Sequence, residues 1–185
     1  PTDLKKIAVG TTATVYAAYL DGDLVALKVS RKSIDDDEAV RAFRREASLL
    51  AQIDHPGCAR VREVITFDER PCLVMDLITK PTLAQYTDKQ EIKLKEALQF
   101  TVKLLEALRA VHDRGAIHRD LQLSNIYWDG SAVTVADFGL AEAYEESENR
   151  SAVGTLHYAS PEQLRSINVP VDQRSDLYSV GAVLF

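Results

Sequence analysis

The sequence predicts an α+β protein in which strands gather near the amino terminus and helices follow. Residues 15–20 and 24–29 are mainly apolar and lie on either side of Asp21-Gly22, which is typical of an antiparallel hairpin. Between Leu94 and Val111 the apolar residues recur at helical spacing, and Gly115 ends that pattern. The chain therefore changes from a strand period to a helical period.

The other elements of the first part follow in order. Residues 39–53 carry apolar side chains at helical spacing and run into His55-Pro56-Gly57, where proline and glycine stop a helix. Two further strands are predicted at residues 61–67 and 72–77. Residues 78–81 form a short connector to the helical part.

A long helix and a small hairpin are the main elements predicted in the second part. The apolar face of the helix is predicted to comprise Leu94, Leu98, Thr101, Leu105, Leu108 and Val111. Residues 126–128 and 133–135 form the hairpin, with Asn125 and Asp137 at its two ends. Loops that follow strands commonly carry functional groups, so these two polar residues are candidates for chemistry.

Composition narrows the classes of partner. A net charge of -6 and a pI near 5.2 argue against a nucleic-acid partner or an anionic membrane surface, which need basic patches. No apolar stretch approaches the roughly 20 residues that span a bilayer, so we expect no membrane segment within this chain. Cys58 and Cys72 lack neighbours at metal-ligand spacing, which favours a reducing, cytoplasmic setting.

Five short motifs stand in a fixed order along the chain. Val25-Ala26-Leu27-Lys28 comes first, followed by His118-Arg119-Asp120 and by Asn125. Asp137-Phe138-Gly139 and Ser160-Pro161-Glu162 complete the series. Their order and spacing resemble the catalytic core of protein kinases, and the last motif resembles the serine/threonine kinases of bacteria.

The resemblance implies a two-lobed, protein kinase-like α+β fold. Residues 1–77 would form an amino-terminal lobe containing a five-stranded antiparallel sheet, the glycine loop and helix C. Residues 78–81 would be the hinge. Residues 82–185 would form a partial carboxy-terminal lobe containing the catalytic loop, the activation segment and helix F, with the last helices of that lobe absent. Asp176 matches the helix F aspartate that holds the catalytic-loop backbone.

The resemblance also implies transfer of the ATP γ-phosphate to a serine or threonine hydroxyl of a protein substrate. Asp120 would orient that hydroxyl and accept its proton. Lys28 would contact the α- and β-phosphates of ATP, held in place by Glu46. Asn125 and Asp137 would bind Mg²⁺, because hard oxygen ligands suit this cation.

The remaining nucleotide contacts are implied by position. The residues that match the family's ATP-binding positions, in addition to Lys28 and Glu46, are Gly10 in the glycine loop, Val15 and Ala26 above the adenine, Met75 at the back of the pocket, and Asp76 and Ile78 in the hinge. An ordinary apolar core would explain Val15 and Met75 almost as well.

Two departures from the family pattern bear on activity. Gln122 occupies the position of a lysine that is directed at the γ-phosphate, and loss of one such electrostatic donor costs roughly 2.7 to 4 kcal/mol of transition-state stabilisation if nothing compensates. Gln122 can still donate a neutral hydrogen bond. Ala8 and Ala13 replace glycines of the loop, and alanine costs about 1 kcal/mol wherever the backbone needs a positive φ.

These departures leave two alternatives open. A pseudokinase would bind nucleotide or a partner protein without transfer, which Gln122 and the glycine loop would explain. A small-molecule phosphotransferase shares the fold, but residues 154–162 resemble a docking segment for a protein substrate. Within that region Thr155 would lie beside Asp120, and Ser147 or Ser151 could carry a phosphate that pairs with Arg119. The sequence does not indicate an oligomeric state.

Overall fold

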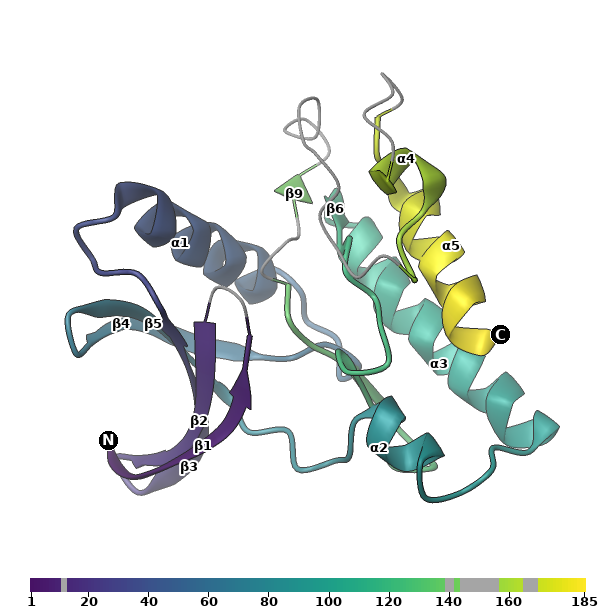
Figure 1. Ribbon diagram of the computed structural model, residues 1–185, viewed down its shortest axis with the longest axis horizontal. Coiled ribbons are helices and arrows are strands. Elements are labelled where there is room, and N and C mark those ends of the chain that lie inside the picture. Colours follow the sequence, from purple (N-terminus) through teal and green to yellow (C-terminus); the bar gives the residue numbers. More distant parts are fainter. Residues whose placement is uncertain (11–12, 139–141, 144–156, 165–169) are drawn as a thin grey trace. The chain divides into compact units, whose positions relative to one another are not determined.

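The chain folds into two compact units (Figure 1). A computed structural model describes residues 1–10, 13–138, 142–143, 157–164 and 170–185. Unit 1 comprises Pro1–Gln52 and Ala59–Thr79, and unit 2 comprises Ile53–Cys58 and Lys80–Phe185. Unit 1 is built on a sheet with one helix, whereas most of the helices belong to unit 2. The α+β fold class predicted from the sequence is confirmed.

Unit 1 contains a five-stranded antiparallel sheet in the order β1-β2-β3-β5-β4. Its strands are β1 (Thr2–Val9), β2 (Ala13–Leu20), β3 (Asp23–Ser30), β4 (Val61–Phe67) and β5 (Arg70–Asp76). The hairpin between β2 and β3 turns at Asp21 and Gly22, whose φ angles are 52° and 91°. A two-residue turn with positive φ at both positions matches the twist of the flanking strands, which is why the Asp-Gly pair predicted this hairpin.

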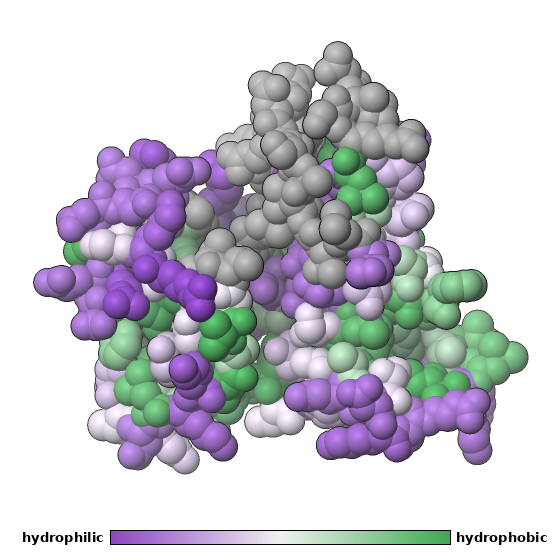
Figure 2. All heavy atoms as spheres, in the orientation of Figure 1, coloured by the Kyte–Doolittle hydropathy of each residue, from purple (hydrophilic) through white to green (hydrophobic). Residues whose placement is uncertain are grey.

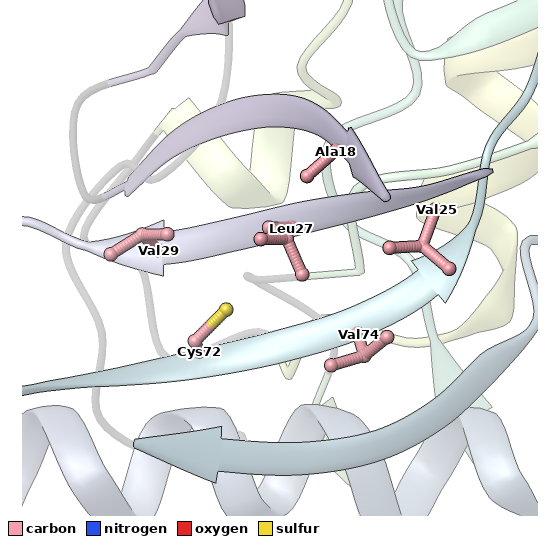
Figure 3. Packing of buried hydrophobic residues seen from close by; sticks show 6 residues of the cluster. All are labelled: Ala18, Val25, Leu27, Val29, Cys72 and Val74. Atoms are coloured by element: carbon pink, nitrogen blue, oxygen red, sulfur yellow. The ribbon is translucent and has the colours of Figure 1, made fainter. Parts of the chain in front are cut away.

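One buried apolar cluster of unit 1 lies on one face of this sheet. Figure 3 shows the buried cluster, which consists of Ala18, Val25, Leu27, Val29, Cys72 and Val74. Side chains of a strand alternate between faces, so the cluster uses every second residue of β3. Ala26 and Lys28 therefore point to the other face. Both faces of β3 are buried from Val25 onward.

Helix α1 (Asp37–Ala51) completes unit 1 and contacts β4 and β5 (Figure 1). Its buried side chains include Phe43, Ala47 and Leu50, and Figure 2 shows a hydrophilic surface over its outer side. The helix begins and ends two residues earlier than the predicted range 39–53. Asp37 and Glu38 occupy its first turn, where acidic side chains offset the helix dipole and favour the earlier start.

Unit 2 contains four helices and two short sheets among its described residues. Its elements are α2 (Leu83–Thr87), α3 (Leu94–His112), β6 (Ala116–Ile117), β7 (Ile126–Trp128), β8 (Val133–Val135), β9 (Glu142–Ala143), α4 (Pro161–Leu164) and α5 (Gln173–Leu184). Helix α2 begins with a capping box, because Thr82 accepts from the backbone of Gln85 and the Gln85 side chain accepts in return. Across the described residues, no helix has the length and apolar character needed to cross a bilayer.

The buried face of α3 differs from the predicted one. Its buried side chains are Phe100, Leu104, Ala107, Leu108 and Val111. Leu94, Leu98 and Leu105, which were predicted to lie on the apolar face, are instead 77%, 60% and 38% exposed. The face is set by tertiary partners: the Trp128 ring meets Phe100 edge-on, with centroids 5.4 Å apart, and Gly57 lies against Ala107. Figure 2 shows hydrophobic residues at the surface over α3 and α5.

The loop Ile53–Cys58 belongs to unit 2 although it precedes β4. The amide of Val135 donates to the carbonyl of Gly57 at 2.8 Å, which ties the loop to β8. A side chain on Gly57 would lie 2.8 Å from the Cβ of Ala107, so only glycine allows this approach to α3. Cys58 and Cys72 are both buried and free, and burial raises the pKa of each thiol to about 12.

Candidate active site

Lys28 and Glu46 form a buried ion pair within unit 1. Lys28 Nζ lies 2.8 Å from Oε1 and 3.0 Å from Oε2 of Glu46, and the two side chains are 8% and 4% exposed. The pair joins β3 to α1. Because a buried ion pair is stabilising only when its geometry is good, contact with both carboxylate oxygens matters. The result is an ammonium held in a fixed position on the strand.

Three of the residues matched to adenine contacts share the sheet face of Lys28. In the strand register Val15 is paired with Lys28, and Ala26 is paired with Met75. Directly paired residues of antiparallel strands lie on the same face. This face is opposite the core cluster of Figure 3, so these side chains are outside that cluster. Ala26, Lys28 and Met75 are 7%, 6% and 7% exposed, so this face of the sheet is buried as well.

Two further residues that were matched to ATP contacts are Asp76, at the end of β5, and Ile78, in the connector that follows. The backbone amide of Asp76 donates to the carbonyl of Arg60 at 3.0 Å, and its carboxylate accepts from Arg62 Nε at 2.6 Å. Arg62 also contacts Asp23 at 2.7 Å, so the arginine links three parts of the sheet. Ile78 is half-buried in the connector that follows.

The glycine loop has ordinary backbone geometry at its described alanines. Gly10 donates its amide to the carbonyl of Ala13 at 2.9 Å, which links the end of β1 to the start of β2. Neither Ala8 nor Ala13 is among the described residues with positive φ. The steric cost of an alanine with positive φ therefore does not arise at these two positions. A Cβ at Gly10 would lie 3.3 Å from the Ala13 oxygen, a close approach.

In unit 2, the carboxylate of Asp120 accepts hydrogen bonds from two side-chain amides. Asn125 Nδ2 lies 3.0 Å from Asp120 Oδ2, and Gln122 Nε2 lies 3.1 Å from the same oxygen. Asn125 Nδ2 also donates to the backbone carbonyl of Asp120 at 2.9 Å. The three predicted catalytic residues of this loop therefore form one hydrogen-bonded group.

The orientation of Asn125 leaves its oxygen for a cation. Both hydrogens of its amide nitrogen are used by Asp120, so Oδ1 is the only atom of the side chain that can ligate a metal. Ser124 Oγ donates to this oxygen at 3.3 Å. The backbone amide of Ala136 donates to the carbonyl of Asn125 at 2.9 Å, which fixes the end of the β7–β8 hairpin.

Asp137 follows β8 at the other end of the same hairpin and has a φ of 64°. A non-glycine residue in this region is strained, and such strain is common at functional sites. Burial and the negative charge of Asp137 raise the pKa of Tyr127. The described residues contain no group of three or more His, Cys, Asp or Glu side chains placed to hold a metal. An amide oxygen and a carboxylate fit Mg²⁺, which uses one or two protein ligands together with water and phosphate oxygens.

His118 is a structural residue of the loop that carries Asp120. Its Nε2 lies 3.1 Å from the carbonyl of Ala136, and its Nδ1 accepts from the amide of Asp120 at 3.3 Å. A donor at Nε2 and an acceptor at Nδ1 define one neutral tautomer. The ring also contacts Phe138, with centroids 4.6 Å apart. Both nitrogens are occupied, so His118 is not placed to act as a base.

Asp176 on α5 accepts two hydrogen bonds from the backbone of this loop. Its Oδ1 accepts from the amide of Arg119 and its Oδ2 accepts from the amide of His118, each at 2.9 Å. His112 Nε2 lies 2.7 Å from the same Oδ2. The sequence did not single out His112, because a histidine at the end of a helix carries no distinctive local signal.

Gln163 is a second residue that the sequence did not single out. Its side chain is buried and contacts the carbonyl of Arg119 at 2.8 Å. A glutamine next to Ser160-Pro161-Glu162 looks like an ordinary polar residue of a short helix, so only the tertiary contact reveals it. Gly139, Ser147, Ser151, Gly154 and Thr155 lie outside the described residues.

The fold and these motifs define a class of protein. A model of the protein kinase domain matches residues 2–185, and the chain belongs to the protein kinase domain family. The mixed fold, with its five-stranded antiparallel sheet, agrees with that membership.

Three proteins with similar sequences come from bacteria. The chain is 35% identical to the probable serine/threonine-protein kinase PknB of Lactococcus lactis, over 98% of this chain and 30% of the relative. It is 34% identical to the serine/threonine-protein kinase PrkC of Bacillus subtilis, over 98% of this chain and 29% of the relative. It is 33% identical to the serine/threonine-protein kinase pkn2 of Myxococcus xanthus, over 98% of this chain and 23% of the relative. The chain thus spans less than a third of the length of these curated relatives.

Proposed function

We propose that the chain carries the catalytic residues of an ATP-dependent protein serine/threonine kinase. The observation that supports this most directly is the Asp120 carboxylate, which Asn125 and Gln122 hold from one side. A carboxylate fixed by two neutral donors remains an acceptor for a substrate hydroxyl. Phosphoryl transfer depends mainly on positioning and on neutralising charge, and a fixed acceptor serves the first of these.

Each unit supplies part of the proposed chemistry. In unit 1, Lys28 contacts the α- and β-phosphates of ATP while Glu46 holds its ammonium. The adenine ring is bound through the sheet face of Val15, Ala26 and Met75. The backbone of Asp76 and Ile78 contacts the edge of the base, and Gly10 allows the chain to approach the phosphates.

In unit 2, Asp120 orients the serine or threonine hydroxyl and accepts its proton. Asn125 Oδ1 and the carboxylate of Asp137 hold Mg²⁺. When bound, this cation neutralises charge on the phosphates. Gln122 replaces a lysine as donor. It has no positive charge, but its amide holds Asp120 in place, so we propose an adapted kinase with a lowered rate.

Intact-mass spectrometry tests the proposal. The protein is incubated with ATP, Mg²⁺ and a generic protein substrate, beside an Asp120→Ala variant, and phosphate incorporation is counted. We expect incorporation with the parent and none with the variant. Equal incorporation with both would mean that Asp120 is not required. Absence of transfer together with measurable ATP binding by the parent would favour a nucleotide-binding pseudokinase.

A further inference from the structure

Gln163 joins helix α4 to the peptide that precedes the proposed catalytic aspartate. It is 4% exposed, and its Nε2 donates to the carbonyl of Arg119 at 2.8 Å. Its Oε1 accepts from both the amide and the hydroxyl of Ser160, each at 3.1 Å. Reversal of the amide would place its NH₂ group against the amide of Ser160, so the contacts fix its orientation.

The peptide that Gln163 contacts has a strained backbone. Arg119 has a φ of 69°, a conformation that side chains other than glycine disfavour. Such a conformation persists only when surrounding groups hold it. The amide of Arg119 is held by Asp176, and its carbonyl is held by Gln163. The two ends of this residue are therefore fixed by side chains from two different helices.

The carbonyl of Arg119 and the amide of Asp120 belong to one planar peptide group. Gln163 holds the oxygen of this group, and His118 Nδ1 accepts from its nitrogen at 3.3 Å. Rotation of the group would change ψ of Arg119 and φ of Asp120, and so the direction in which the Asp120 side chain leaves its Cα. Orientation of a reacting group contributes strongly to rate, so a small displacement of Asp120 has a large kinetic consequence.

We propose that Gln163 is a positioning residue for phosphoryl transfer, which fixes the Arg119–Asp120 peptide and so the direction of the Asp120 carboxylate. The inference rests on the proposed kinase function and extends it to a residue outside the catalytic loop. Gln163 follows Ser160-Pro161-Glu162, the end of the segment matched to protein-substrate docking. Its side chain thereby couples that segment to the proposed base.

Two substitutions at Gln163 and one matched control test the role. Gln163→Met keeps the length of the side chain but removes both the donor and the acceptor. Gln163→Glu keeps the acceptor for Ser160 but sets a charged oxygen against the Arg119 carbonyl. Leu164→Ala is the control, because Leu164 is the next residue of α4, is 41% exposed, and has no side-chain group that can donate or accept a hydrogen bond. For each protein we would measure kcat, KM for ATP and the unfolding midpoint.

We expect Gln163→Met to lower kcat by about a hundredfold with KM for ATP changed by less than about threefold, because positioning acts on the transition state. Leu164→Ala should keep kcat within about threefold of the parent. Protonated glutamic acid has an O–H donor and a carbonyl acceptor, so it can make both the contact to Arg119 and the contact to Ser160 that Gln163 makes. The kcat of Gln163→Glu relative to the parent should therefore rise as the pH falls. Burial disfavours a charged carboxylate, so it raises the pKa of a glutamic acid at this position.

Hydrogen exchange supplies a readout that does not require activity. Exchange in a peptide spanning residues 117–122 should accelerate in both Gln163 variants and remain unchanged in Leu164→Ala. If the parent transfers no phosphate, the proposed function fails, and exchange alone decides the role of Gln163. Parent-like kcat in a folded Gln163→Met, an equal loss in Leu164→Ala, unchanged exchange, or global unfolding of both Gln163 variants would overturn the positioning role.

Discussion

Gln122 donates its side-chain amide to Asp120, with Nε2 3.1 Å from Oδ2. The residue that replaces a lysine is therefore engaged with the proposed base. Asn125 reaches the same oxygen at 3.0 Å, so the carboxylate is oriented by two neutral donors. Neutral donors hold a carboxylate in place without the charge that a lysine would direct at a phosphate.

A Gln122→Lys variant should be faster than the parent. A lysine adds a positive charge where negative charge develops on the transferring group, and one such donor changes kcat by about 10² to 10³. We expect an increase of at least about tenfold, because Gln122 already supplies part of the effect through Asp120. Steady-state phosphate transfer measures it. Gln122→Met serves as the control and should be slower than the parent, since it donates nothing. Equal rates for all three proteins would show that this side chain has no role.

A Lys28→Met variant should be less stable than the parent. It leaves the carboxylate of Glu46, whose side chain is 4% exposed, buried without its ammonium partner. Removal of one member of a buried pair costs about 3 to 5 kcal/mol in the free energy of unfolding. Urea denaturation monitored by circular dichroism measures the loss. The double variant Lys28→Met/Glu46→Leu should recover most of it, and a double variant no more stable than the single one would contradict this account.

Glu162 should make the free energy of unfolding depend on pH in the acidic range. Burial alone would raise the pKa of Glu162, but hydrogen bonds from Ser175 and Ser160 outweigh burial and lower it from the ordinary value of 4.5. A lowered folded-state pKa means that the stabilisation is present above pH 4.5 and is lost as the pH falls through the folded-state value.

The unfolding midpoint of the parent should therefore fall more steeply below pH 4.5 than that of Glu162→Gln. The only tryptophan, Trp128, is 0% exposed in unit 2, so its fluorescence reports unfolding of the unit that contains Glu162. Parallel curves for the two proteins would contradict the lowered pKa.

Two leucines of α3 should differ sharply in their contribution to stability. Leu104 is 0% exposed and Leu98 is 60% exposed. Leu104→Ala should cost about 2 to 5 kcal/mol, because it removes buried methyl groups and leaves a cavity. Leu98→Ala should change the free energy of unfolding by no more than about 0.5 kcal/mol. Denaturant unfolding measures both. Similar losses would mean that both residues are covered in solution.

Local sequence signals predicted the framework of the fold well. The Asp21-Gly22 pair indicated a hairpin because its turn needs two positive φ angles, which the structure has. The fold class and the family also followed from motif order. The buried face of α3 did not, because it depends on Trp128, which meets Phe100 from a distant hairpin. A helical pattern in which apolar residues occupy two adjacent faces does not say which face finds partners.

The part of the candidate site that short motifs encode could be predicted from the order and spacing of those motifs. The order and spacing of Asp120, Asn125 and Asp137 match the pattern of protein kinases, and their assigned roles stay predictions. The contacts of Gln163 and His112 could not be read from the sequence, since both arise between segments far apart along the chain. Neither Ala8 nor Ala13 has a positive φ, so the cost of an alanine in that conformation does not arise at these two positions.

The two buried cysteines lie in different units, with Cys72 in unit 1 and Cys58 in unit 2. Only a thiolate reacts rapidly with an alkylating reagent, and a thiol whose pKa is about 12 forms almost none at neutral pH. Modification of either cysteine must then wait until its surroundings open. Alkylation rates followed separately at the two sites would report how often each unit opens, without any engineered label.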